Sequence, residues 1–196
     1  MLNVICTVYQ RVEPIKILIG SFLVQSSSKW KLYIIHDGPA PEKLKEYMAQ
    51  YKNNNFIEFT ETEKVNGYWG HPNRNIMLRK MILNHSDFLL ITNDDNYYVP
   101  KFVEYFLLSA SRGPKTGMVY CDMIHSHLEY GVLKSRIEIG FVDMGSFIVR
   151  IDVAKKVGFK YINMAADGQF AIDCHKLCRK MKLRVNYIEK PLFVHN

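Results

Sequence analysis

The sequence has few cysteines, and their spacing does not indicate a disulfide framework or a zinc site. Only four occur in 196 residues, at Cys6, Cys121, Cys174 and Cys178. The last two share one face of a predicted helix, but a structural zinc site needs two further ligands at suitable spacing. We therefore expect four reduced thiols.

Long apolar runs are also missing. No stretch reaches the roughly 20 residues of a membrane-spanning helix. The opening residues, MLNVICTVYQR, lack the basic segment and apolar core of a secretory leader. We therefore expect a cytoplasmic protein without a transmembrane segment. The absence of linkers and repeats predicts one domain over residues 1–196, either a whole protein or the N-terminal domain of a longer one.

Two glycine-rich phosphate-binding patterns are absent as well. A sugar-1-phosphate nucleotidyltransferase would carry a glycine-rich loop after its first strand, whereas residues 9–13 contain no glycine. Residues 113–117, Gly-Pro-Lys-Thr-Gly, lack the frame of a P-loop. The P-loop phosphotransferases are thereby excluded, and the nucleotidyltransferase remains only an alternative.

The charge balance, in contrast, is clearly basic. Lys and Arg number 26 against 19 Asp and Glu, a net charge of +7, which favours an anionic partner. A nucleic-acid-binding module is the alternative from a different class of function. It would need Lys and Arg clustered with aromatic residues on one face. The basic residues are spread along the chain, so we expect no nucleic-acid partner.

Short β-branched runs alternate with amphipathic stretches in the first half of the chain. They predict strands at residues 2–8, 31–36, 56–60 and 88–92, and helices at residues 14–25, 41–52 and 73–84. The second half predicts an antiparallel ribbon (118–125 and 131–137), a strand (147–150), a helix (167–181) and a final strand (184–188). This pattern is typical of an α/β fold, a three-layer α/β/α sandwich around a mostly parallel, mixed sheet.

Acidic residues follow the fourth predicted strand directly. Asp94 and Asp95 are adjacent, and two such carboxylates repel each other unless a cation compensates them. Mg²⁺ or Mn²⁺, held by one or two carboxylates and by substrate phosphates, would provide that charge. The alternative is that one of the two acids caps a helix beginning near Pro100.

Residues 93–100, Asn-Asp-Asp-Asn-Tyr-Tyr-Val-Pro, resemble the metal-binding DXD segment of GT-A glycosyltransferases, family 2 in particular. Further segments match that family in order, and the resemblance covers nearly the whole chain. They are the first strand with Thr7 and Tyr9, Asp37 after the second strand, residues 70–75 around Arg74, residues 141–150 and 153–158, Asp167, and His195. The resemblance implies an inverting transferase that moves a sugar from a UDP-sugar, or a related nucleotide sugar, to a hydroxyl of a glycan or other acceptor.

The same resemblance implies the roles of the nucleotide-binding residues. Thr7 and Tyr9 would border the nucleobase, and Asp37 would accept a hydrogen bond from a uracil or thymine. Arg74 would pair with the nucleotide, and Asp94 would contact the ribose or a metal-bound water. Three of these residues have a structural alternative: a core aromatic for Tyr9, a turn cap for Asp37 and a surface helix arginine for Arg74.

The metal and catalytic roles follow in the same way. Asp95 would bind Mn²⁺ or Mg²⁺, and His195 would complete the shell, as imidazole does for softer divalent ions. Asp167 would be the general base that takes the proton of the acceptor hydroxyl, with Asp143 or Asp173 as the next candidates. The alternatives are a frayed terminal histidine and, for Asp167, a helix cap.

Overall fold

The computed structural model describes residues 1–81, 84, 87–113, 115–160, 163 and 165–196. The strands are β1 (Leu2–Val8), β2 (Trp30–His36), β3 (Ile57–Glu61), β4 (Phe88–Asn93), β5 (Tyr97–Tyr98), β6 (Thr116–His125), β7 (Gly131–Leu133), β8 (Phe147–Arg150) and β9 (Arg184–His195). The α-helices are α1 (Glu13–Leu23), α2 (Glu42–Ala49), α3 (His71–Lys80), α4 (Phe102–Ser111), α5 (Ile151–Val157) and α6 (Ala166–Lys180).

These strands form one mixed sheet in the order β3-β2-β1-β4-β8-β6-β9-β5, with β7 paired to β6. β1 pairs in parallel with β2 and with β4, and every residue of β1 is buried. The chain therefore winds from β1 outward to β3, then crosses back to β4 on the other side of β1. In open α/β sheets, ligands bind at such a reversal of strand order, outside the carboxyl ends of the strands.

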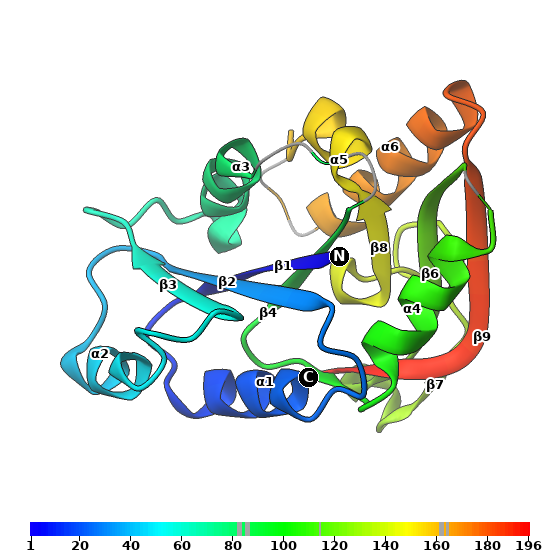
Figure 1. The fold of residues 1–196 in the computed structure, drawn as a ribbon. Helices are drawn as coiled ribbons and strands as arrows, with labels where there is room; N and C mark the ends of the chain where they lie inside the picture. The colour runs from blue at the N-terminus through cyan, green and yellow to red at the C-terminus, as the bar shows by residue number, and fades with distance from the viewer. Residues whose placement is uncertain (82–83, 85–86, 114, 161–162, 164) are drawn as a thin grey trace.

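Helices cover both faces of the sheet and create two hydrophobic cores (Figure 1). α1, α2 and α4 pack on one face, where Phe22, Leu44 and Phe106 are buried. α3, α5 and α6 pack on the other face, where Met77 and Phe170 are buried. The predicted three-layer α/β sandwich is confirmed. The four cysteines are free and buried, as expected.

β8 is antiparallel to its two neighbours, but β6 and β9 run in the same direction as the parallel strands of the first half. β8 runs antiparallel to β4 and to β6, so β6 and its parallel neighbour β9 run in the same direction as β4. The carboxyl ends of β1, β2, β4, β6 and β9 therefore lie along one edge. The residues that precede β8 reach the same edge from the other direction.

Three predicted elements differ most from the structure. The predicted helix 73–84 begins at His71 and ends at Lys80, because Pro72 occupies the first turn and Gly70, at φ +79°, precedes it; residues 82–83 lie outside the described part. The predicted strand 131–137 ends at Leu133. The predicted final strand 184–188 continues to His195, passing Pro191 at a register shift in its pairing with β6. Proline is tolerated in a strand at such irregularities.

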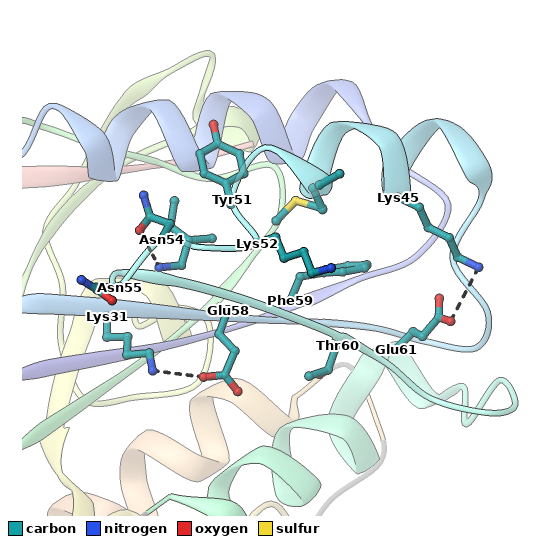
Figure 2. Close-up of a pocket in the computed structure, with 13 residues that line it drawn as sticks. Lys31, Lys45, Tyr51, Lys52, Asn54, Asn55, Glu58, Phe59, Thr60 and Glu61 are labelled. Atoms are coloured by element: carbon teal, nitrogen blue, oxygen red, sulfur yellow. Dashed lines mark hydrogen bonds and ion pairs between the residues drawn. The ribbon is translucent and has the colours of Figure 1, made fainter.

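A groove of about 640 Å³ lies at the outer edge of the sheet, between α2 and β3. Figure 2 shows two ion pairs along it, from Lys31 to Glu58 at 3.0 Å and from Lys45 to Glu61 at 3.6 Å. It lies along β3, away from the reversal of strand order. None of the helices in the described part of the chain has the length and apolar character to cross a bilayer.

The packing of α1 predicts the effect of two neighbouring substitutions. Phe22 is fully buried against Trp30 and Tyr98, whereas Leu23 is 49% exposed. Phe22→Ala should lower the free energy of unfolding by about 3–5 kcal/mol, since it leaves a cavity in the core. Leu23→Ala should change it by less than about 0.5 kcal/mol. Urea denaturation followed by circular dichroism measures both, and equal losses would show that α1 packs differently.

Candidate active site

A cleft of about 930 Å³ opens at the carboxyl ends of the central strands. Its lining includes every residue predicted to bind nucleotide or to act as the base: Thr7, Tyr9, Asp37, Arg74, Asp94 and Asp167. The two predicted metal ligands, Asp95 and His195, are not among the lining residues. The strand register explains the convergence, because Thr7 pairs with Asn93 and Val8 pairs with His36.

Thr7, near the end of β1, and Tyr9, directly after it, form one wall of the cleft. Tyr9 is 49% exposed, so it is not the core aromatic of the alternative interpretation, and its ring stacks on His36 with centroids 6.2 Å apart. Thr7 is buried and lies against Gly70, where an added Cβ would be only 2.7 Å from its Oγ1. The start of α3 can approach β1 this closely because residue 70 has no side chain.

Asp37 is buried and holds the loop between β3 and α3. Its Oδ1 accepts hydrogen bonds from the Asn66 backbone N–H at 2.7 Å and from Asn73 Nδ2 at 2.8 Å. Its Oδ2 accepts one from the Gly67 N–H at 2.9 Å. A carboxylate offers about four acceptor positions, and these three bonds occupy two on Oδ1 and one on Oδ2. Asp37 thus fixes a distant loop, which differs from the turn cap of the alternative interpretation, and it also lines the cleft.

Arg74 is 1% exposed and is not a surface arginine. Its guanidinium donates to Asn93 Oδ1 and to His71 Nδ1, both at 2.6 Å. Burial, together with the charge of Arg74, lowers the pKa of His71 to about 4, so the neutral ring can accept this bond. Burial also lowers the pKa of Arg74, while Asp167, Asp143 and Asp94 oppose that effect. Arg74 therefore places a positive charge among three carboxylates.

Asp94 and Asp95 share one guanidinium, that of Arg11. Arg11 pairs with both oxygens of Asp94 through Nε and Nη2, and its Nη1 lies 2.8 Å from Asp95 Oδ2. Asp94 is 1% exposed, and burial raises its pKa to about 6 although Arg11 acts in the other direction. The loop that carries the two acids is stabilised by Thr92, whose Oγ1 accepts a hydrogen bond from Tyr98 Oη at 2.8 Å. The predicted need for a compensating cation is met here by Arg11.

Asp167 lies in the first turn of α6, and the helix cap is Ala165, so the capping alternative does not hold. Its Oδ1 is buried without a hydrogen-bond partner among the described residues. Burial and the nearby charge of Asp143 raise the pKa of Asp167 to about 7, partly offset by Arg74. Asp143 is held by the Gly145 N–H, which donates to its Oδ1 at 2.7 Å. Asp167 itself can therefore take up or release a proton near neutral pH.

His195 ends β9 inside a cluster of imidazoles and is not frayed. Its ring stacks on His125 with centroids 4.3 Å apart, and His127 lies 6.4 Å away. Its Nε2 lies 3.6 Å from Asp143 Oδ2. The next residue, Asn196, contacts the loop that carries Asp94 and Asp95. Its Nδ2 donates to the backbone oxygen of Asp95 at 2.7 Å.

The predicted metal ligands are neighbours along this edge without forming a closed site. Among the described residues, no group of three or more His, Cys, Asp or Glu side chains is arranged to hold an ion. The donor chemistry nevertheless fits Mg²⁺ or Mn²⁺, which are bound by one or two carboxylates together with substrate phosphates. The buried Nδ1 of His195, which has no partner among the described residues, is a further donor of the expected kind.

Three site residues were given no role by the sequence prediction. Arg11 follows β1 as a single basic residue, with no signal that it would reach Asp94 and Asp95. His71 carried no recognisable partner, although it lies three residues before Arg74 on α3, a spacing that places the two on one face. Trp69 lines the cleft beside Gly70. Asp143 was named only as a reserve candidate for the base, and the structure places it beside Asp167.

Comparison with known proteins gives matches in structure only. No family model matches the chain, and no curated protein matches it in sequence. TarS from S. aureus, residues 1–349, superposes over 100% of this chain and 60% of its own, with a TM-score of 0.78 at 15% identity. A TarS structure in complex with UDP-GlcNAc gives a TM-score of 0.77 at 14% identity, over 99% of this chain and 58% of its own.

Two other transferases match nearly as well. The mannosyltransferase PcManGT from Pyrobaculum calidifontis, in complex with GDP-Man and Mn²⁺, has a TM-score of 0.69 at 13% identity, over 99% of this chain and 56% of its own. GalNAc-T7 with UDP, GalNAc and Mn²⁺ has a TM-score of 0.70 at 11% identity, over 99% and 42%. The chain thus spans three fifths or less of the structures it matches.

The raised pKa of Asp167 predicts how stability depends on pH. Between about pH 4 and pH 7 the folded state keeps a proton on Asp167 that the unfolded state releases, so the free energy of unfolding falls as pH rises. Asp167→Asn cannot titrate and should remove this part of the fall. The variant should exceed the wild type at pH 8 by roughly 4 kcal/mol, because a rise in pKa from 3.8 to about 7 spans about three pH units at about 1.36 kcal/mol each.

Urea denaturation at pH 5, 6, 7 and 8 measures this difference. Asp173→Asn is the matched control, because Asp173 lies on the same helix and pairs with Gln169 and Lys160 outside the cleft. It should follow the wild-type curve. Parallel curves for Asp167→Asn and the wild type would contradict the burial of an ionisable Asp167.

Proposed function

We propose that the chain, whose fold is that of the GT-A glycosyltransferases, transfers a sugar from a nucleoside-diphosphate sugar, with UDP-sugars favoured, to a hydroxyl group of a glycan or other acceptor. The observation that supports it best is the cleft at the reversal of strand order. The buried Arg74 lies near the carboxylates of Asp94, Asp143 and Asp167. Arg74, Asp94 and Asp167 line the cleft. TarS and GalNAc-T7, which share the fold, have been solved with UDP or UDP-GlcNAc.

The nucleotide would lie along β1, with its base toward Asp37. The remaining acceptor position on Asp37 Oδ2 would suit the imide N–H of uracil, which adenine lacks. Tyr9 offers an exposed ring at the same end of the cleft. Arg74 and Arg11 supply the two guanidinium groups near the place where a diphosphate would lie, and guanidinium matches phosphate oxygens in pairs. Fixed donors of this kind stabilise the negative charge that develops on a leaving diphosphate.

Asp95 and His195 would hold a divalent ion, with Asp94 near its water or the ribose. A bound Mn²⁺ or Mg²⁺ would neutralise charge on the diphosphate. Arg11 now supplies the charge that compensates Asp94 and Asp95, so it has to release at least Asp95 for the ion to bind. The side chain of Arg11 is half exposed, so it would have room to turn toward the diphosphate once these bonds break.

Asp167 would act as the general base. In a direct displacement, the acceptor oxygen forms a bond to the anomeric carbon while the bond from that carbon to the diphosphate oxygen breaks. The acceptor proton passes to Asp167, and the configuration at the carbon inverts. A base works best when its pKa lies near the working pH, and the pKa of Asp167 is raised to about 7. Burial is the main cause of that rise in pKa, and the nearby Asp143 adds to it.

Thermal-shift measurements test nucleotide and metal together. UDP with Mn²⁺ should raise the melting temperature more than GDP or ADP with Mn²⁺, or UDP with chelator, because bound ligand stabilises the folded state. Asp95→Asn should abolish the metal-dependent part. Asp94→Asn should weaken it less, since an amide still accepts a hydrogen bond from ribose. Equal shifts for all nucleotides, with or without metal, would rule out both the base pocket and the metal site.

The role of Asp167 is tested by turnover. Asp167→Asn should lower the transfer rate by about two to four powers of ten, while UDP affinity stays within a few-fold, because the side chain would face the acceptor hydroxyl. Hydrolysis of the donor by water should fall in parallel. NMR of the product should show inversion at the anomeric carbon. Retention of configuration, or near-normal turnover in the variant, would remove the general-base assignment.

A further inference from the structure

Trp69 is a large apolar side chain left open to solvent inside a binding cleft. It is 63% exposed, and no large apolar side chain in the described residues is more exposed. It lines the cleft with Thr7, Tyr9 and Asp37. Its neighbour Tyr68 is 55% exposed but does not line the cleft. An exposed indole ring of this kind has an energetic reason to be covered by a ligand.

The backbone around Trp69 is held in an unfavourable conformation. Gly67, Tyr68, Trp69 and Gly70 all have positive φ, at +69°, +51°, +51° and +79°. Glycine adopts this region freely, but bulky residues such as tyrosine and tryptophan do so at a cost in free energy. Residues in this region persist where the surroundings enforce them and are concentrated at ligand sites. The position of the ring is therefore imposed by the fold.

Two anchors impose it, one on each side of the Tyr68-Trp69 pair. On one side, the Gly67 N–H donates to Asp37 Oδ2 at 2.9 Å. On the other, Gly70 packs directly on Thr7 and its N–H donates to the Gly67 carbonyl at 3.1 Å. The ring itself lies near His71, with centroids 6.5 Å apart. The loop thus joins Asp37, proposed to accept a hydrogen bond from the nucleobase, to Thr7, proposed to border it.

We propose that Trp69 is a stacking platform for the nucleobase, an inference that rests on the proposed nucleotide-sugar specificity of the cleft. The residue is connected through Gly67 to Asp37, which would accept a hydrogen bond from the base. Through Gly70 it is connected to Thr7 of β1. Stacking on an aromatic face tolerates any base. Trp69 would therefore supply affinity, while Asp37 would supply the preference for uracil.

Isothermal titration of the wild-type chain with UDP and with pyrophosphate, both with Mn²⁺, tests this division. Trp69→Ala should weaken UDP binding roughly ten- to a hundredfold, the loss typical of one base–aromatic stack. It should leave pyrophosphate binding unchanged, because pyrophosphate has no base. Trp69→Phe should keep most of the affinity. Tyr68→Ala is the matched control, with an exposed ring on the same backbone, and should bind UDP within about twofold of the wild type.

Intrinsic fluorescence gives an independent measurement, because the chain contains only two tryptophans. Trp30 begins β2 and is 5% exposed, at the opposite end of the strand from the cleft. UDP should therefore quench the wild-type emission through Trp69 and should leave the emission of Trp69→Phe unchanged. Quenching that persists in Trp69→Phe would contradict the proposal.

The outcomes separate this inference from the proposed function. If UDP binding depends on Mn²⁺ and on Asp95 but is unchanged in Trp69→Ala, the stacking role is wrong and the transferase assignment stands. If Trp69→Ala weakens UDP and pyrophosphate equally, Trp69 serves the loop and not the base, and the inference again fails. A wild-type chain that binds no UDP under any metal condition would overturn both.

Discussion

The parallel pairing of β1 with both β2 and β4 is the constraint on which the site depends. β1 is buried along its whole length, and a strand in that position can exist only if both of its edges are paired. The register of those two ladders then fixes which residues leave the sheet together. Asp37 follows β2 and Asp94 follows β4, and the reversal of strand order between them leaves space for a ligand. A shift of one residue in either ladder would turn these side chains to the other face.

The charges at this edge are opposite in sign to the chain as a whole. The net charge is +7, yet Asp94, Asp143 and Asp167 are gathered around a common point. Buried carboxylates without compensation are costly, so the structure places Arg74 among them and Arg11 over Asp94 and Asp95. The raised pKa of Asp94 and Asp167 shows that this compensation is incomplete. An apolar core would be more stable, and such a residual cost is characteristic of sites that bind or react.

The loops around the cleft combine a backbone fixed by hydrogen bonds with aromatic side chains that are exposed to solvent. The acid loop after β4 is fixed by hydrogen bonds to Thr92, and the loop before α3 is fixed by Asp37. The ring of Trp69 projects into solvent from the loop before α3, and the ring of Tyr9 projects into solvent directly after β1. A rigid frame that presents exposed aromatic groups can bind a flat ligand without first having to order itself, which lowers the entropic cost of binding.

The alternation of strands and helices by itself determined the α/β class, the parallel first half and the acids that follow its strands. That success has a physical reason: in βα units, the hydrophobic period and the strand ends are local properties of the sequence.

Only the tertiary structure decided how β6, β8 and β9 join the sheet, because antiparallel and crossover pairings connect residues far apart in the chain. It therefore decided that Asp143 lies beside Asp167 and that His195 stacks on His125. It also decided that Arg11 pairs with Asp94 and Asp95, and that Trp69 adopts a left-handed conformation facing the cleft. Neither is readable from sequence, since one depends on a flexible side chain and the other on anchors at Asp37 and Thr7 that form only when the sheet is complete.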